Sequence, residues 1–327
     1  MISLKRVYIS MIAASLLGSC SGYLSENGVN TLPQVEKIGL AMEGGGYLST
    51  ASANEITPFL FRDSSTGNAY LFFASDRDGS YAIYYAQMDS SGKFFNLAKM
   101  GLDINQPRST NFSPVVFKAG GVNYIAYLTV NTNIFFNPSN NILTYALNGS
   151  FATNSTGLAF NGVNGSTNYS QISVYTSSAG TVYLQGAYGS FSGGTSIQQY
   201  YFNTATGAPN WTFSSIIEVS SLHYSTGEFV TTSGPSTNMY ILYDNISGSK
   251  HQLGGEVYSF GTTTNTTAFS IKDYASSAND AFPYIDTAGG YKVYFASDRA
   301  GNGNYDLYRY NILTYDKEVP SSLREGF

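Results

Sequence analysis

Short apolar runs recur along this chain at a nearly constant interval. An anchor strand opens around Pro58, Pro114, Gln171, Gly227 and Pro283, so neighbouring anchors are 56, 57, 56 and 56 residues apart. Each anchor is followed by a turn rich in Gly, Ser and Asn, and then by further apolar runs. Runs of this length, rich in β-branched and aromatic residues, are typical of strands rather than helices. The pattern therefore predicts five sheet units.

Within each unit the strands keep the same order. The second strand is rich in aromatic residues and is expected at 70–73, 124–127, 182–184, 239–242 and 293–295. The third strand is expected at 82–85, 142–145, 197–200, 256–258 and 306–308, and a less regular fourth at 94–97, 158–160, 211–213 and 268–271. Repeated four-stranded sheets hide most of their edges when they are arranged radially. We therefore predict an all-β fold, a five-bladed β-propeller with four-stranded blades.

The ring needs a closing strand, because the fifth unit has only three clear strands. Residues 34–42 lie before the first anchor and place apolar side chains alternately at Ile38, Leu40 and Met42. An open ring would expose apolar faces at its two ends. We expect this N-terminal segment to supply the outer strand of the fifth blade, with an ordinary linker as the alternative. Residues 34–327 are then one propeller domain.

The N-terminus has the pattern of an export signal. Lys5 and Arg6 precede a mostly apolar stretch, 7–17, which is too short to cross a bilayer as a helix. The stretch ends in the sequence Leu-Gly-Ser-Cys at 17–20, which resembles the lipobox of bacterial lipoproteins. The resemblance implies cleavage before Cys20 and acylation of that cysteine.

The expected mature chain is a tethered envelope protein. Residues 1–19 are read as the lipoprotein signal peptide and 20–33 as a flexible tether, with the membrane as a partner through the lipid. Ser21, rather than Asp, follows the cysteine, which by resemblance to the enteric sorting rule favours the outer membrane. The alternative is an incidental cysteine behind an ordinary signal peptide.

Composition excludes several other classes. The 327 residues include 28 Tyr and 21 Phe, which is enough apolar surface to make disorder a poor description. With 16 Lys and Arg against 21 Asp and Glu, there is no basic excess for binding nucleic acid. Cys20 is the only cysteine, so an exported body has no internal disulfide. No cofactor is expected, because no Gly-rich phosphate loop leads into a helix.

Two stretches of the chain are nearly the same. An apolar strand followed by Ser75-Asp76-Arg77-Asp78-Gly79 matches one followed by Ser297-Asp298-Arg299-Ala300-Gly301. This resembles the TolB-type propeller repeat, and the resemblance implies an interaction module. In physical terms the motif is a turn device, in which the Asp accepts N–H groups, the Gly takes a positive φ and the Arg pairs with a nearby acceptor. Ser75, Asp76, Arg77, Gly79, Ser297, Asp298, Arg299 and Gly301 are its structural residues.

A candidate ligand site follows from the anchors. Three residues before each anchor stand Glu55, Asn111, Asn168, Tyr224 and Asp280. The first strand of a propeller blade lines the central channel, so these polar residues are expected to surround one mouth of it. The alternative is that they cap the strand starts and bond to neighbouring loops.

A catalytic interpretation uses the same residues. Glycoside hydrolases use paired carboxylates that flank the scissile bond, and Glu55 and Asp280 are candidates, with Glu228 or Asp286 nearby. His223 and His251 accompany no Ser or Cys signature, and their scarcity argues against a zinc site. No metal site is predicted.

Two functions are therefore weighed. The first is a non-enzymatic module that binds or scaffolds a protein or glycan partner through the channel mouth and loops. The second is a glycan-acting hydrolase that uses Glu55 and Asp280. An ion-paired or capped ring favours the module, whereas two carboxylates about 5–10 Å apart in an open pocket favour the enzyme.

Overall fold

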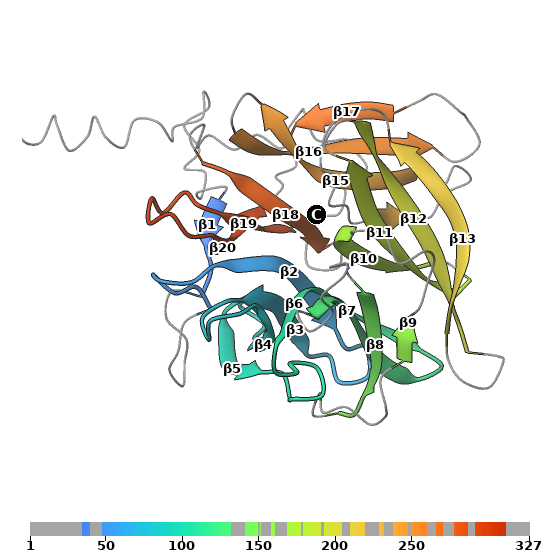
Figure 1. Cartoon of the computed structure of the whole chain (residues 1–327), viewed down its shortest axis with the longest axis horizontal. Helices are drawn as coiled ribbons and strands as arrows, with labels where there is room; N and C mark the ends of the chain where they lie inside the picture. The colour runs from blue at the N-terminus through green and yellow to red at the C-terminus, as the bar shows by residue number, and fades with distance from the viewer. Residues whose placement is uncertain are drawn as a thin grey trace, which may run out of the picture.

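The computed structural model describes residues 35–39, 48–131, 141–149, 151, 158–160, 169–177, 179–190, 193–204, 210–219, 229–231, 238–247, 250–259, 266–270, 278–286 and 292–311. Its regular elements in these ranges are all strands, and they form five four-stranded sheets (Figure 1). The all-β propeller class predicted from the sequence is confirmed. Within each sheet, the strands that follow one another in the sequence are antiparallel neighbours.

Three sheets occupy the first two thirds of the chain. The first contains β2 (Glu55–Arg62), β3 (Ala69–Ser75), β4 (Ala82–Met88) and β5 (Phe94–Lys99). The second contains β6 (Ser109–Ala119), β7 (Val122–Asn131), β8 (Asn141–Leu147) and β9 (Leu158–Phe160). The third contains β10 (Tyr169–Thr176), β11 (Val182–Ser190), β12 (Gly193–Asn203) and β13 (Asn210–Val219).

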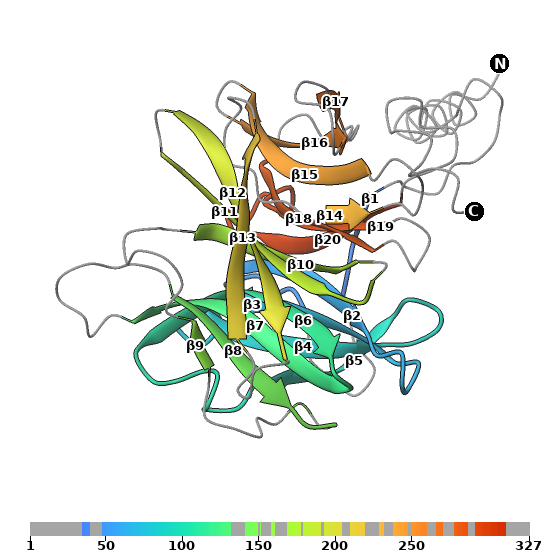
Figure 2. The same cartoon turned by 90° about the vertical axis from the view of Figure 1, so that its right-hand side faces the viewer.

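Two sheets follow. The fourth contains β14 (Phe229–Thr231), β15 (Asn238–Ser247), β16 (Lys250–Ser259) and β17 (Thr266–Ser270). The fifth has the order β1-β20-β19-β18, with β18 (Asp280–Asp286), β19 (Lys292–Ser297), β20 (Asp306–Asn311) and β1 (Val35–Lys37). Figure 2 shows β15–β17 and β6–β9 on opposite sides of the molecule.

The first strand of each sheet lies toward the centre. β2 contacts β6, β6 contacts β10, β10 contacts β14, and β18 contacts both β15 and β2. Contacts therefore run through all five sheets and return to the first one. Figure 1 shows β2, β6, β10 and β18 meeting at the middle of the molecule.

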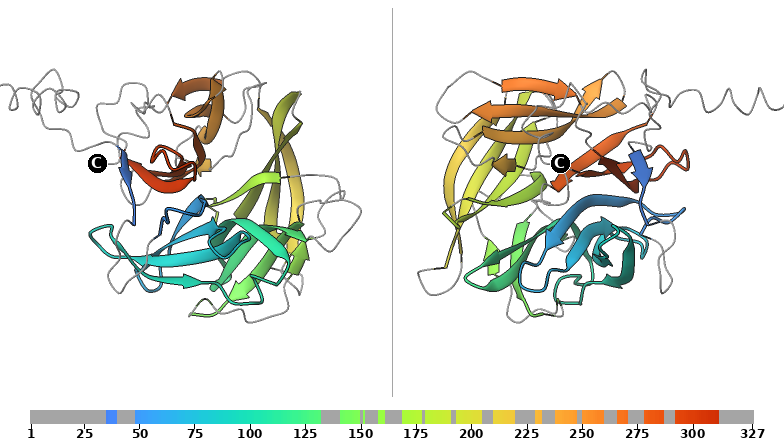
Figure 3. Two further views of the ribbon diagram at one scale, coloured as in Figure 1. Left: turned by 60° about the vertical axis from the view of Figure 1, so that its left-hand side comes forward. Right: turned by 180° about the vertical axis from the view of Figure 1, so that it is seen from behind.

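The N-terminal segment closes the C-terminal sheet. β1 pairs antiparallel with β20, with Val35 opposite Tyr310 and Lys37 opposite Tyr308. Ile38 continues this pairing by donating its N–H to the Leu307 carbonyl at 3.0 Å. Figure 3 shows β1 beside the C-terminal strands. The predicted closing strand is confirmed, and of the alternating residues that predicted it, Leu40 and Met42 lie outside the described residues.

Aromatic rings fill the space between neighbouring sheets. Phe117 of β6 packs against Phe202 and Trp211 of the third sheet, with ring centroids 5.0 and 5.2 Å apart. Phe59 of β2 meets Tyr284 of β18 at 4.7 Å, which joins the first and fifth sheets. These rings bury apolar surface between sheets, which is one use the fold makes of its many aromatic residues.

Three inner strands carry the same backbone irregularity. Thr57, Ser113 and Phe282 have φ values of 51°, 52° and 55°, and each directly precedes a proline. The strand register shifts at each of these sites. A left-handed conformation is uncommon for residues other than glycine. The three sites are β-bulges, which bend an inner strand and redirect its side chains.

Candidate functional site

Glu55 begins β2 and is completely buried. Its carboxylate accepts hydrogen bonds from the Thr50 backbone N–H at 3.1 Å and from the Ser75 hydroxyl at 3.0 Å. The Thr50 hydroxyl also donates at 3.2 Å, and Arg77 forms an ion pair at 3.1 Å. Burial raises the pKa of Glu55, while the bonds from Thr50, Arg77 and Ser75 oppose that rise. The side chain is enclosed by its partners and does not lie in an open mouth.

Asp280 begins β18 and has the same surroundings in the fifth sheet. It is 3% exposed, and the Arg299 guanidinium lies 2.7 Å from its Oδ1 atom. The Nε atom of Arg299 donates to the Ser297 hydroxyl at 3.0 Å, as Arg77 does to Ser75 at the same distance. The two sheets therefore hold an inner-strand carboxylate in the same way.

Aromatic rings support both arginines. Arg77 lies 4.8 Å from the ring centre of Tyr84, and Arg299 lies 4.8 Å from that of Tyr308. A guanidinium over an aromatic face is attracted by the ring quadrupole and restrained in position. These contacts leave each arginine directed at its carboxylate.

The motif aspartates act on the residue that precedes each carboxylate. Asp76 accepts the backbone N–H of Asn54 at 2.7 Å and its side-chain amide at 2.9 Å. Asp298 accepts the same two groups of Asn279, both at 2.7 Å. Gly79 and Gly301 have φ values of 93° and 74°, which a turn with glycine accommodates without strain. We call the two assemblies the clasps: Asn54, Glu55, Ser75, Asp76 and Arg77 in the first sheet, and Asn279, Asp280, Ser297, Asp298 and Arg299 in the fifth.

Asn111 is the third placed residue of the predicted ring, and it too is buried. Its side-chain amide donates to the Ile104 carbonyl at 3.1 Å and to the Ser109 hydroxyl at 2.9 Å. Its backbone N–H donates to the carbonyl of Tyr81, which directly precedes β4, just as the Glu55 N–H donates to the carbonyl of Tyr305, which directly precedes β20. The starts of the inner strands are thus bonded to the preceding sheet. Asn168 and Tyr224 lie outside the described residues.

The other candidate residues are also paired or not described. Asp286 ends β18 and binds Arg62, which ends β2, through two contacts at 2.6 and 3.2 Å. Cys20, His223 and Glu228 lie outside the described residues. For His251, the structure describes the backbone, as part of β16. Among the described residues, no cluster of three or more His, Cys, Asp or Glu side chains could hold a metal ion.

The asparagines of the clasps, Asn54 and Asn279, were not among the predicted site residues. Asn54-Glu55 and Asn279-Asp280 are equivalent dipeptides. In each, the asparagine stands four residues before an anchor proline and the acidic residue three residues before it. That repetition is visible in the sequence and could have identified them. No signal marked Thr50 as a partner of Glu55, because it belongs to the loop before β2.

The fold is shared with glycan-acting enzymes of known structure. An exo-1,5-alpha-L-arabinanase from a bovine ruminal metagenomic library has a TM-score of 0.53 and 12% identity, covering 81% of this chain and 95% of that one. A GH43_1 enzyme from Xanthomonas citri, complexed with xylotriose, has a TM-score of 0.55 and 9% identity, covering 83% and 90%. The catalytic domain of a Coprinopsis cinerea GH62 alpha-L-arabinofuranosidase has a TM-score of 0.54 and 11% identity, covering 85% and 97%.

Sequence comparison adds nothing to this likeness: no protein-family model matches the chain, and no curated protein is significantly similar to it. In the part of the chain that the structure describes, no helix is long and apolar enough to cross a membrane.

These findings correct two interpretations. The resemblance to TolB-type repeats is wrong as an assignment, since the similar structures are glycoside hydrolase propellers and no family model supports a lipoprotein of TolB type. The motif misled because it is a local device: its Ser, Asp and Arg hold a strand start, and such a contact does not define a family. The non-enzymatic binding or scaffold module is also overturned, because the matching propellers are enzymes that act on glycans.

Proposed function

We propose that this chain is a glycan-acting hydrolase built as one closed ring of five blades. The observation that carries the proposal is the similarity of its fold, over more than four fifths of the chain, to an arabinanase and to an enzyme that binds xylotriose. The continuous contacts of the inner strands support the closed ring. The substrate class proposed is a neutral plant-type polysaccharide of pentose or galactose units, since a galactanase shares the fold as well.

Glu55 is the proposed general acid. Hydrolysis of a glycosidic bond needs one carboxyl group to protonate the leaving oxygen and one carboxylate to act on the other side of the sugar. Burial raises the pKa of Glu55, and a raised pKa keeps a carboxyl protonated to higher pH. Asp280, on the neighbouring strand β18, is the proposed partner.

The ion pairs of the clasps limit the access of a substrate to the two carboxylates. Glu55 and Asp280 are buried beneath Arg77 and Arg299, so a sugar reaches them only if the arginines move. A carboxylate that serves structure alone would keep its ion pair in every state. The two possibilities differ in what happens when each carboxylate is replaced by its amide.

The test is a hydrolysis screen of the purified protein. Linear arabinan, xylo-oligosaccharides and galactan are incubated with wild type, Glu55→Gln and Asp280→Asn, and released sugars are separated and quantified. Asp298→Asn is the matched control, since it changes a clasp carboxylate that bonds Asn279 and not Arg299. We expect a loss of at least about a hundredfold in the first two variants and a small change in the control. No hydrolysis by wild type on any substrate would refute the proposal.

The location of the protein is part of the proposal. Cys20 at the end of the signal-like segment is the proposed lipid attachment site, which would anchor the body in the bacterial envelope, at the outer membrane given Ser21. Several acyl chains together give stable anchoring. Mass spectrometry of the membrane form should show an acylated Cys20, and Cys20→Ser should be released. A Cys20→Ser variant that stays on membranes would contradict the anchor.

A further inference from the structure

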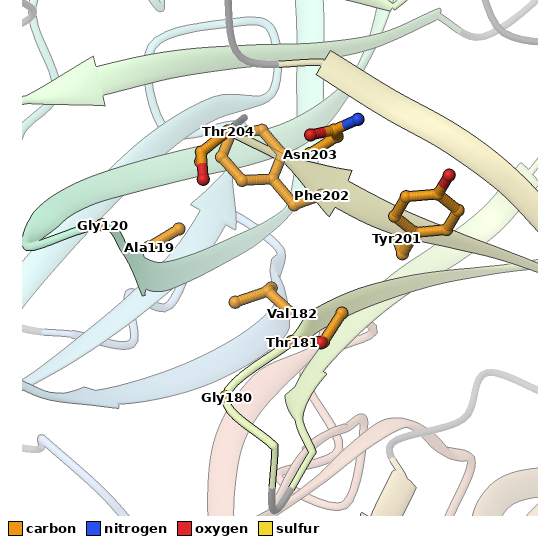
Figure 4. Close-up of a pocket in the computed structure, with 9 residues that line it drawn as sticks. All are labelled: Ala119, Gly120, Gly180, Thr181, Val182, Tyr201, Phe202, Asn203 and Thr204. Atoms are coloured by element: carbon orange, nitrogen blue, oxygen red, sulfur yellow. The ribbon is translucent and has the colours of Figure 1, made fainter. Parts of the chain in front are cut away.

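A pocket lies between the second and third sheets, at the opposite end of the inner strands from the clasps. It has a volume of about 310 Å³ and opens between two hairpin turns (Figure 4). The end of β6 and the turn after it contribute Ala119 and Gly120, and the turn before β11 contributes Gly180 and Thr181. Glu55 and Asp280 begin their inner strands, whereas Ala119 ends β6. The pocket is therefore separate from the proposed catalytic carboxylates.

The lining combines an apolar floor with a neutral polar rim. Val182 and Phe202 are buried, and Figure 4 shows Ala119 and Val182 on facing sides of the hollow. Thr181 and Asn203 supply a hydroxyl and an amide at the rim. None of the lining residues is charged. Such a lining favours a neutral ligand that has both an apolar face and several hydroxyl groups.

A row of tyrosines lies on the other face of the third sheet from Val182 and Phe202, because successive strand residues point to opposite faces. Tyr201 lines the pocket and lies opposite Tyr183 of β11, which lies opposite Tyr175 of β10. The rings of Tyr175 and Tyr183 stack, with centroids 5.0 Å apart and planes 12° from parallel. All three side chains are half-buried and so retain some accessible surface. The aromatic ring on the pocket's own face of the sheet is therefore that of Phe202, and the apolar surface available to a ligand comes from Phe202, Val182 and Ala119.

We propose that this pocket binds one or two sugar units of a neutral glycan, as a second carbohydrate site at the opposite end of the inner strands from Glu55 and Asp280. The volume is at the lower end of the range for small-molecule pockets, which suits a short saccharide and excludes a folded partner. The absence of charge in the lining argues against phosphate or a carboxylated ligand. The identity of the glycan rests on the proposed function, while the existence of the site does not.

The experiment measures saccharide binding to the purified full chain by titration calorimetry. Xylotriose, arabinotriose and a β-1,3-linked galacto-oligosaccharide are the probes. Ala119→Trp fills the pocket from one hairpin, and Thr181→Trp fills it from the other, so a folding failure in one variant leaves the second. Phe213→Ala is the matched control, because Phe213 is an aromatic residue of the same sheet that is 45% exposed and does not line the pocket.

We expect at least one probe to bind wild type, and both filling variants to weaken that binding by at least about tenfold, which corresponds to about 1.4 kcal/mol. The Phe213→Ala control should bind like wild type. Binding that survives both filling variants, or that falls equally in the control, would overturn the inference, as would no binding of any probe.

Glu55→Gln separates this inference from the proposed function. The second site predicts that this variant binds saccharide with the wild-type stoichiometry at the pocket, and that adding Ala119→Trp abolishes it. If wild type hydrolyses nothing but binds a probe in a manner sensitive to Ala119→Trp, the proposed function fails and the second site stands. If wild type hydrolyses a substrate but pocket filling has no effect on saccharide binding, the proposed function stands and the second site is refuted.

Discussion

Arg77 and Arg299 are the counter-ions of two carboxylates that have almost no contact with solvent. Removing one partner of a buried ion pair leaves an uncompensated charge, which costs about 3–5 kcal/mol. Arg77→Met should therefore lower the free energy of unfolding by an amount in that range, measured by urea denaturation. Lys99→Met is the control: the Lys99–Asp78 pair is 42% and 51% exposed, and an exposed pair contributes about 1 kcal/mol or less. Equal losses in both variants would mean that Glu55 is not held as described.

The protonation of Glu55 should give the fold a distinctive pH dependence. Burial raises the pKa of Glu55 above its ordinary value of 4.5. The folded state then binds a proton that the unfolded state has lost, so this stability contribution is complete below pH 4.5 and is lost as pH rises through the folded pKa. Urea denaturation across about pH 4 to 7 should show a smaller decline with rising pH in Glu55→Gln than in wild type.

Asp63 provides the control of opposite sign. A hydrogen bond from the Ser65 hydroxyl lowers the pKa of Asp63 below its ordinary value of 3.8. Its contribution is therefore present above pH 3.8 and is lost as pH falls through the folded pKa. The free energy of unfolding of wild type should rise as pH increases at the acid end of the range. In Asp63→Asn this rise should be smaller. If the free energy of unfolding of wild type and of Glu55→Gln changed with pH in parallel, the raised pKa of Glu55 would be contradicted.

At the scale of residues, the sequence allowed the clasps to be recognised in part. The repeated Ser-Asp-Arg-x-Gly motif predicted a turn with a paired arginine, and the structure shows which carboxylate each arginine binds. The partner was not predictable from the motif, because Glu55 lies on the preceding strand and Thr50 on a loop. Polar residues before an anchor are compatible with either a ligand site or a strand cap. Only the side-chain contacts distinguish the two.

The bulged inner strands form a chain of bonds between sheets. Ser113 of β6 donates its N–H to the Thr57 hydroxyl of β2 at 3.0 Å, and its own hydroxyl accepts the Ile172 N–H of β10 at 2.8 Å. Ser113→Ala should leave that buried N–H without its partner, at a cost of about 1–3 kcal/mol. The free energy of unfolding should fall accordingly. Ser113→Gly should lose less, because glycine adopts the φ of 52° without strain; a larger loss for glycine would contradict the bulge account.

β1 protects the outer edge of the fifth sheet. Its ion pairs, Lys37 with Asp306 and Glu36 with Arg309, hold it beside β20. A chain that starts at residue 44 lacks β1 and should expose an unpaired edge, which is a template for association with another chain. Light scattering should then show oligomers or aggregates and denaturation a lower stability. A chain that starts at residue 31 keeps β1 and is the control; monomeric behaviour of both would mean that β1 is dispensable.

Strand positions were the most predictable elements, because each sheet alternates apolar runs with turns. The expected strand 94–97 lies within β5 (Phe94–Lys99), and 306–308 lies within β20 (Asp306–Asn311). The third strand of the fourth unit was expected at 256–258, whereas β16 spans Lys250–Ser259. Its first part contains His251 and two glycines, which carry little apolar signal, and it is held as a strand by pairing with β15. Backbone pairing extended this strand beyond what its side chains indicate.

At the scale of the whole molecule, the repeat interval identified the architecture but not the activity. Equal spacing is typical of units that pack on their neighbours, and the contact of β18 with β2 joins the last sheet to the first. Function depends on a few side chains placed on that frame, and the same frame serves different chemistries. The sequence therefore left module and hydrolase both open, and the likeness to solved enzymes, which shows the fold, is what supports the hydrolase as the proposed function.

A closed ring should unfold as one unit, and the seam between the first and fifth sheets allows a test. Tyr284 donates its hydroxyl to the Leu60 carbonyl across this seam at 2.8 Å, whereas Trp211, the only tryptophan, lies in the third sheet. Tyr284→Phe should cost about 1 kcal/mol. In a ring, that loss should shift the urea midpoint of Trp211 fluorescence as far as the midpoint of far-ultraviolet circular dichroism. In an array of independent sheets, the Trp211 transition would stay in place while the other moved, because terminal units of such arrays unfold separately.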